Sequence, residues 1–276
     1  RGVHFESIHH IKQKNRRMNM KYFTKFLCLF LGAAMMLTMA ACGSKSDTDA
    51  NAGADGEKKQ LVVATSPDFP PFEFLDGSQI VGIEPALMQA IADKLGLELQ
   101  IDDMDFDAAL LSVQQGKADI VMAGVTVTDE RKAVMDFSDS YATGIQSIIV
   151  PEGSDIASPD DLAGKKIGTQ RGTTGYIYCS DDFGDDAVVA YDDGLTAVQA
   201  LNNGQVDAVV IDNAPAKEFI AANPGLVILE TSYAEEDYAI GLAKGSSLKD
   251  AINGALEELK ADGTLQSIVD KYITAE

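Results

Sequence analysis

Histidine is nearly missing from this 276-residue chain, and the three that occur, His4, His9 and His10, all lie in its first ten residues. A Ser-His-Asp or Cys-His nucleophile needs a histidine, and many zinc and haem sites use histidine as a ligand. The rest of the chain can therefore host none of these sites.

Basic residues are also scarce. The chain has 22 Lys and Arg against 43 Asp and Glu, which gives a formal net charge of −21. Nucleic-acid-binding proteins need a basic face that neutralises phosphates, so we expect no nucleic acid partner. With 46% hydrophobic and 24% charged residues, the composition is that of an ordinary globular protein with room for one large domain or two lobes.

Long apolar runs are limited to one, Phe26–Ala41, which Lys21 and Lys25 precede. This run is shorter than the roughly 20 residues of a membrane-spanning helix. Its length and flanks are typical of a signal-peptide core, and a short membrane anchor that stays attached is the alternative. We expect the residues before Met18 or Met20 to be an upstream extension that precedes the true start.

The run ends in Met39-Ala40-Ala41-Cys42, which resembles the lipobox of bacterial lipoproteins, with Met39 where leucine is usual. The resemblance implies that residues 1–41 are an upstream extension and a lipoprotein signal peptide. It also implies that Cys42 carries a lipid anchor, which would place the protein outside the cytoplasm on the bacterial cytoplasmic membrane. From 43 to 59 no large apolar residue occurs, so we expect residues 42–59 to be the lipidated cysteine and a flexible linker.

Cysteine is limited to Cys28, Cys42 and Cys179. With Cys42 lipidated, Cys179 has no partner for an intramolecular disulfide. We interpret Cys179 as a small buried apolar residue on a helix, and a reactive thiol is the alternative.

After residue 60, short runs rich in Val and Ile alternate with amphipathic stretches, a pattern typical of βα units around a largely parallel sheet. The fold class is therefore α/β. The predicted strands are Leu61–Thr65, Leu97–Ile101, Ile120–Gly124, Lys166–Thr169, Ala187–Tyr191, Ala208–Asp212 and Leu226–Leu229. The predicted helices are Pro85–Leu95, Asp107–Gln115, Leu195–Asn203, Ala214–Ala222, Leu248–Lys260 and Leu265–Tyr272.

One pattern of helix, glycine, two residues, aspartate and strand occurs twice, at Val113–Val121 and again at Leu201–Val209. Each copy leads into polar residues, Gly124–Thr128 in the first and Asp212-Asn213 in the second. Ligands of open α/β sheets bind beyond the carboxyl ends of strands, so two such sheets facing each other would form a cleft between two lobes. The alternative is that this order is common in α/β proteins and implies no paired lobes.

Two groups of motifs carry a resemblance to a known family. They are Leu61–Thr65 with Phe69–Phe74, and Ala123–Arg131 with Asp136-Phe137-Ser138. Over residues 60–275 the chain resembles the polar amino-acid-binding proteins of ABC importers, the bacterial extracellular solute-binding proteins of family 3, and is most similar to the glutamine-binding branch.

The resemblance implies a two-lobe, type II periplasmic-binding-protein fold with a ligand cleft between the lobes. Lobe 1 would comprise residues 60–140 and 243–276, and lobe 2 residues 141–242. The chain would cross between them near Ser140–Gly144 and again near Tyr238–Leu242.

Arg131 is the leading candidate for a ligand-binding residue. Thr128 or Asp129 can cap a helix that carries Arg131, and an arginine binds a carboxylate through two parallel hydrogen bonds. By resemblance, Arg131 pairs with the α-carboxylate of an amino acid with help from Thr126, and the Gly124 carbonyl, next to Ala123, accepts from the α-ammonium. The alternative is a surface arginine paired with an acidic neighbour.

In the second lobe, Gln170–Gly175 follows a strand and opens a helix, where unsatisfied backbone N–H groups and the helix dipole favour an anion. The resemblance places Gly172, Thr173 and Thr174 against the ligand carboxylate. A phosphate is the alternative, but no lysine follows at P-loop spacing.

Six further residues complete the candidate site, of which Ser66, Ala123 and Gln170 are placed in its lining by resemblance. By resemblance, Asp212 binds the α-ammonium, and Phe69 and Phe106 flank the ligand side chain. Asp212 could instead cap the helix that starts at Asn213, and both phenylalanines could belong to the core.

Two departures from the glutamine-binding branch affect the substrate. Ser66 stands where that branch has an acidic residue, and Gln170 replaces a lysine. We expect Asp68 to point away from the ligand if Phe69 faces it. The sequence therefore predicts a neutral polar or small apolar L-amino acid, glutamine among them, rather than arginine or lysine.

The chain is thus predicted to be a lipid-anchored receptor that delivers a free L-amino acid to an ABC permease and its ATPase, as a monomer and without enzymatic activity. No cofactor is expected, and the acidic pairs of the chain lack the EF-hand pattern, so we expect no metal site. Alternatives are an extracytoplasmic dehydratase of the same fold, of the cyclohexadienyl or arogenate type, with Glu73 and Asp212 as its carboxylates, or a ligand-sensing module.

Overall fold

The computed structural model describes residues 60–273. The predictions for the signal peptide, Cys42 and the linker therefore lie outside the described residues, as do the last three residues of the predicted lobe 1. Within 60–273, no helix has the length and apolar character that crossing a membrane requires.

The first lobe is built on a five-stranded sheet in the order β5-β1-β6-β14-β7. β1 runs parallel to β5 and β6, and β14 is antiparallel to β6 and β7. Its strands are β1 (Gln60–Thr65), β5 (Glu98–Asp103), β6 (Ile120–Val121), β7 (Met135–Phe137) and β14 (Gly241–Ala243). Its helices are α2 (Ile83–Leu95), α3 (Phe106–Gln114), α4 (Asp129–Val134), α8 (Lys249–Ala261) and α9 (Thr264–Tyr272).

Helices cover both faces of this sheet, which explains the unbroken apolar sequence of β1. Leu61 and Val63 belong to one buried cluster that includes α2 and α8, whereas Val62 and Ala64 belong to another that includes α3. Successive side chains of a strand point to opposite faces, so a strand buried on both sides reads as a continuous apolar run.

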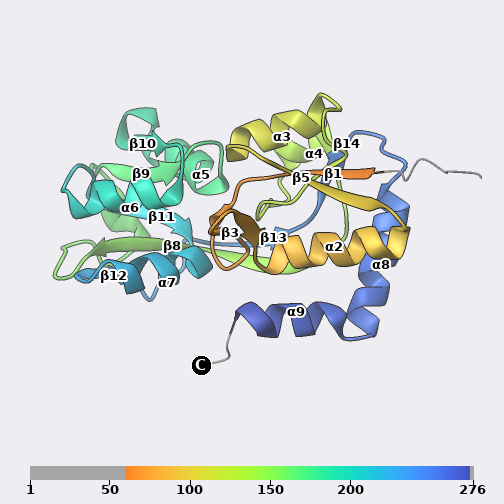
Figure 1. Cartoon of the computed structure of the whole chain (residues 1–276). Coiled ribbons are helices and arrows are strands. Elements are labelled where there is room, and N and C mark those ends of the chain that lie inside the picture. Colours follow the sequence, from red (N-terminus) through yellow and green to blue (C-terminus); the bar gives the residue numbers. More distant parts are fainter. Residues whose placement is uncertain (1–59, 274–276) are drawn as a thin grey trace, which may run out of the picture. The chain divides into compact units, whose positions relative to one another are not determined.

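The second lobe is built on a six-stranded sheet in the order β10-β9-β11-β8-β12, in which β13 also pairs with β8. Its strands are β8 (Ala142–Pro151), β9 (Ile167–Gln170), β10 (Val188–Tyr191), β11 (Ala208–Asp212), β12 (Leu226–Ile228) and β13 (Ala234–Tyr238). Its helices are α5 (Thr174–Phe183), α6 (Gly194–Asn202), α7 (Asn213–Ala222) and the short η1 (Pro159–Leu162) and η2 (Asp185–Ala187). Figure 1 shows β9, β10 and β11 in one lobe and β1, β5 and β14 in the other.

Two antiparallel strands lead from one lobe to the other. β8 and β13 pair from Gln146↔Ala234 to Ala142↔Tyr238. At that end Tyr238 also bridges to Thr126, and the next residue, Ala239, donates its backbone N–H to the Val125 carbonyl at 3.1 Å. This double connection brings the carboxyl ends of β6 and β11 close to each other.

The predicted strands and helices are confirmed, with shifts of a few residues at their ends. Cys179 is buried on α5, as predicted, and it is a free cysteine within residues 60–273. The prediction missed β7, β8, β13 and β14, and a small three-stranded sheet formed by β2 (Asp68–Phe69), β3 (Glu73–Asp76) and β4 (Gln79–Val81). Asp68, Phe69 and Glu73 of this small sheet line the pocket described next.

Candidate functional site

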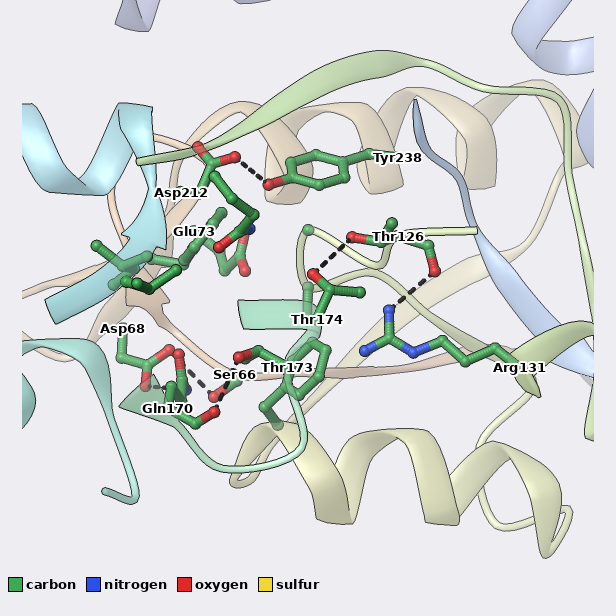
Figure 2. Close-up of a pocket in the computed structure, with 17 residues that line it drawn as sticks. Ser66, Asp68, Glu73, Thr126, Arg131, Gln170, Thr173, Thr174, Asp212 and Tyr238 are labelled. Atoms are coloured by element: carbon green, nitrogen blue, oxygen red, sulfur yellow. Dashed lines mark hydrogen bonds between the residues drawn. The ribbon is translucent and has the colours of Figure 1, made fainter. Parts of the chain in front are cut away.

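A pocket of about 460 Å³, including space open to solvent, lies between the two lobes. Eleven of the twelve predicted ligand-binding residues line it, and only Gly172 does not. Figure 2 shows side chains from both lobes converging on it. The pocket is lined by Ser66, Asp68, Phe69, Glu73, Phe106, Ala123, Gly124, Thr126, Arg131, Gln146, Gln170, Thr173, Thr174, Val210, Ile211, Asp212 and Tyr238.

Arg131 is buried at the edge of this pocket and is not a surface residue. Its backbone N–H donates to the Thr128 hydroxyl at 3.2 Å, which confirms Thr128 as the N-cap of α4. The guanidinium donates through Nη1 to the Thr126 carbonyl at 2.8 Å and through Nη2 to the Gly172 carbonyl at 3.1 Å. It also lies over the ring of Phe106, 5.4 Å from the centroid.

The environment of Arg131 suits an anion. Burial lowers the pKa of Arg131, and the Glu236 carboxylate opposes that change. Arginine has five N–H donors, and the two protein carbonyls leave donors for a carboxylate in the pocket. Gly172 does not line the pocket, but its carbonyl holds the Arg131 guanidinium from the second lobe.

The start of α5 faces Arg131 across the pocket. Thr173 is the N-cap of α5, and its hydroxyl donates to the Gln170 carbonyl at 2.8 Å. The hydroxyls of Thr174 and Thr126 are 3.5 Å apart, which joins the lobes (Figure 2). The first backbone N–H groups of a helix lack partners within it, so this end of α5 can also bind a carboxylate.

Asp212 both caps a helix and lines the pocket, so its capping role does not remove it from the pocket. Its Oδ1 accepts from the Ala214 N–H at 2.9 Å, and its Oδ2 accepts from the Ile145 N–H at 2.9 Å and from the Tyr238 hydroxyl. Burial raises the pKa of Asp212 to about 6. At neutral pH this carboxylate is a suitable partner for an ammonium group.

The prediction that Asp68 points away from the pocket is wrong. Asp68 and Phe69 both line it. β2 has only two residues, and the Asp68 N–H turns back to the Ser66 carbonyl at 2.8 Å, so the side-chain alternation of a regular strand does not apply.

The carboxylate of Asp68 joins the two lobes. It accepts from the Ser66 hydroxyl at 3.1 Å and from Gln170 Nε2 at 3.0 Å (Figure 2). Burial raises its pKa to about 6. An acidic group therefore lies at the end of the pocket that lacked one in the sequence-based prediction.

Glu73 is the most deeply buried acid of the pocket, with no exposed surface. Neither of its carboxyl oxygens has a hydrogen-bond partner among residues 60–273. Burial and the neighbouring Glu84 raise its pKa well above the ordinary value. Glu84 itself accepts from the Gly124 N–H at 2.8 Å and from the Tyr141 hydroxyl, so it supports the loop that carries Gly124.

The aromatic residues form one wall. The ring of Phe69 lies 5.7 Å from that of Phe72 and 6.4 Å from that of Tyr238. Gly124 has φ +57°, and a Cβ there would lie 2.8 Å from the Phe69 ring, so the glycine allows this close packing. Sequence reasoning missed Tyr238 and Gln146 because the strands that carry them were not predicted.

A family model for the bacterial extracellular solute-binding proteins, family 3, matches residues 61–275. The chain belongs to this family. It is 33% identical over 264 residues to the arginine-binding extracellular protein ArtP of Bacillus subtilis, a match that spans 91% of this chain and 99% of ArtP.

Solved structures of similar proteins share the fold of this family 3 protein. The arginine-, lysine-, histidine-binding protein ArtJ of Geobacillus stearothermophilus matches with a TM-score of 0.76 and 35% identity, over 79% of this chain and 96% of ArtJ. An ancestral arginine-binding protein bound to glutamine matches with a TM-score of 0.75 and 42% identity, over 79% of this chain and 99% of that protein. These matches confirm the predicted family and the two-lobe α/β fold.

The relatives of this family 3 protein reported above are binding proteins, so the dehydratase alternative is not favoured. The family is extracellular by description, which agrees with a location outside the cytoplasm.

Proposed function

We propose that this chain is the substrate-binding protein of an ABC importer, which captures an L-amino acid between its lobes and delivers it to the membrane permease and ATPase. The observation that carries the proposal is a bipolar pocket, with Arg131 on one lobe and Asp212 on the other. An amino acid presents a carboxylate and an ammonium on one carbon, and these two residues match that pair of charges.

In this proposal, the α-carboxylate binds to Arg131 and to the start of α5 at Thr173 and Thr174. The α-ammonium binds to Asp212 and to the Gly124 carbonyl. Each lobe supplies part of the site, so a bound amino acid stabilises the arrangement in which the lobes meet.

The side chain of the ligand would extend between Phe69 and Phe106 toward Ser66, Asp68 and Gln170. The Asp68 carboxylate is an acceptor at this end, and among the described residues that line the pocket Arg131 is the one basic side chain. We therefore rank ligands with several N–H donors first, with arginine ahead of glutamine. Glutamine, predicted from the sequence, donates through its amide, whereas a guanidinium adds charge and more donors.

Relatives support this ranking without deciding it. ArtP is named for arginine, and the ancestral arginine-binding protein was solved with arginine and with glutamine. The proposal also includes the lipid anchor at Cys42, the removal of the leader and a monomeric state, which rest on the sequence around Met39–Cys42 and on the family resemblance.

Thermal unfolding of the purified protein, freed of co-purified ligand, against each L-amino acid tests the proposal. A ligand at a hundredfold excess over its Kd stabilises by about 2.7 kcal/mol, which shifts Tm by several degrees. We expect the largest shift for arginine or glutamine, lost in Arg131→Ala and kept in Arg171→Ala. Arg171 is a matched control because it is exposed. If no amino acid shifts Tm, the receptor function is wrong.

A further inference from the structure

Glu236 is a buried acid that lies behind the carboxylate end of the pocket. It is on β13 opposite Gly144 of β8, within the pair of strands that connects the lobes. Its exposed fraction is 5%, yet it is not one of the residues that line the pocket. It is connected to the pocket through the residues that it binds.

One oxygen of Glu236 binds one residue from each lobe. Oε2 accepts from the Thr126 hydroxyl at 3.0 Å and from Gln146 Nε2 at 3.0 Å. Both donors line the pocket. The amide of Gln146 is further confined at Gly175, where a Cβ would lie 2.9 Å from Gln146 Oε1. Glu236 thus fixes the orientation of two groups that face the ligand.

The bond to Glu236 decides how Thr126 can meet a ligand. A threonine hydroxyl has one proton, and here that proton is donated to Glu236. The Thr126 oxygen therefore acts as an acceptor toward Thr174, 3.5 Å away. A ligand carboxylate must then be bound by the Arg131 guanidinium and backbone N–H groups rather than by the Thr126 hydroxyl.

The charge of Glu236 acts on the same end of the pocket. Thr126 connects the two charged groups, since its hydroxyl binds Glu236 and its carbonyl accepts from Arg131 Nη1 at 2.8 Å. The second oxygen of Glu236, Oε1, has no hydrogen-bond partner among residues 60–273. A carboxylate that interacts electrostatically with a buried guanidinium offsets part of its attraction for another anion.

We propose that Glu236 has two roles at the end of the pocket where Arg131 would bind the ligand carboxylate. It is a positioning residue that orients Thr126 and Gln146, and it is a countercharge whose negative charge limits how tightly Arg131 binds that carboxylate. The proposal rests on the proposed amino-acid function. Limited affinity suits a receptor, which must release its ligand to a permease.

The variant Glu236→Gln separates charge from position. The amide oxygen can still accept from Thr126 and Gln146, but the charge is gone. We expect the amino acid that stabilises the wild-type protein to bind Glu236→Gln about tenfold more tightly than it binds the wild-type protein. The α-carboxamide of that amino acid lacks the carboxylate, so its affinities for Glu236→Gln and for the wild-type protein should agree within about threefold.

Glu236→Ala removes the charge and both hydrogen bonds. Because Thr126 and Gln146 lose their partner, we expect this variant to bind the amino acid about tenfold more weakly than Glu236→Gln does. Glu235→Gln is the matched control, since it removes a charge from an exposed position on the same strand and should leave both affinities unchanged.

Isothermal titration of the full chain with the amino acid and its α-carboxamide gives both affinities, and thermal unfolding without ligand checks that each variant folds. Equal changes for the two ligands in Glu236→Gln, or no change for either, would overturn the countercharge. If Glu236→Ala does not fold, the isosteric variant Glu236→Gln still tests whether Glu236 acts as a countercharge. A wild-type protein that binds no amino acid would instead contradict the proposed function itself.

Discussion

Two aspartates of the pocket hold their protons to higher pH than a free aspartate does. Burial raises the pKa of Asp68 and that of Asp212 to about 6. A bound ammonium or guanidinium favours the ionised carboxylate and lowers that pKa in the complex, so the free protein binds more protons than the complex below about pH 6.

Ligand affinity should therefore be constant above about pH 7 and fall as the pH falls through about 6, by up to about tenfold per pH unit for each aspartate that contacts the ligand. Titration calorimetry between pH 5 and pH 8 measures this directly. Asp68→Asn should reduce the slope, whereas the exposed Asp129→Asn should leave it unchanged. An affinity that rises toward acid pH would contradict this assignment.

The same two aspartates affect the stability of the free protein in the opposite direction. Their pKa is higher in the folded than in the unfolded chain, so the folded state binds more protons between about pH 4 and pH 6. Their contribution to stability is largest at acid pH and is lost as the pH rises through 6. Binding function and stability therefore have different pH optima at these residues.

Arg131 depends on the shape of its side chain as well as on its charge. Its Nη1 and Nη2 donate to carbonyls of the two lobes, Thr126 and Gly172. Lysine keeps the charge but has no planar fork. We expect Arg131→Lys to lower amino-acid affinity about a hundredfold, measured by titration calorimetry. Arg171→Lys is the control, and near-wild-type affinity in Arg131→Lys would show that charge alone suffices.

At the scale of elements, the β8–β13 pair depends on a close contact between Gly144 and Tyr238. A Cβ on Gly144 would lie 2.4 Å from Tyr238 Cζ and from its hydroxyl oxygen, closer than real side chains approach. The Tyr238 hydroxyl donates to Asp212 in the pocket. Gly144→Ala must therefore displace the Tyr238 ring and disturb both the strand pair and the ligand site.

We expect Gly144→Ala to destabilise the protein by about 1–3 kcal/mol and to weaken amino-acid binding. Gly254→Ala is the opposite case, because Gly254 is exposed within α8 and nothing lies within 4 Å of its added Cβ. This control should stabilise by up to about 1 kcal/mol and leave binding unchanged. Chemical unfolding and ligand titration of both variants test this prediction. Equal free energies of unfolding for Gly144→Ala and Gly254→Ala would contradict the packing argument.

The elements that sequence reasoning missed share one physical property, which is that distant pairing defines them. β13 reads Ala-Glu-Glu-Asp-Tyr, with three consecutive acids and no strand pattern of its own. It becomes a strand because it pairs with β8, about ninety positions earlier in the chain. The predicted strands such as β1 and β11 instead have apolar sequences that are buried on both faces.

The residues of the pocket divide in the same way, into those that local sequence indicates and those that distant strand pairing brings there. Predicted residues within local motifs, such as Arg131 after Thr128 and Thr173 before α5, line the pocket, because their capping chemistry and their resemblance to the family can both be read in the sequence. Gln146 and Tyr238 were missed with their strands. Asp68 was identified but misplaced, because the turn at Ser66 breaks the alternation on which the prediction relied.

At the scale of the whole molecule, the described part of the chain carries a large excess of acid. The first 59 residues have ten basic and five acidic side chains, so of the 22 basic and 43 acidic residues, residues 60–276 retain 12 and 38. The ion pairs among residues 60–273 involve Lys94, Lys132, Lys165, Lys244 and Arg171. Most carboxylates therefore repel one another without a partner, and this repulsion opposes the compact state.

Salt should stabilise this protein in the absence of ligand. Raising the ionic strength from about 0.01 M to about 0.5 M shortens the screening length from about 30 Å to a few ångströms, which weakens repulsion over the whole surface more than it weakens the few exposed ion pairs. We expect Tm to rise by several degrees in sodium chloride and equally in choline chloride, measured by calorimetry. A rise confined to one cation would indicate specific ion binding, and a fall in Tm would show that attraction between surface charges outweighs their repulsion.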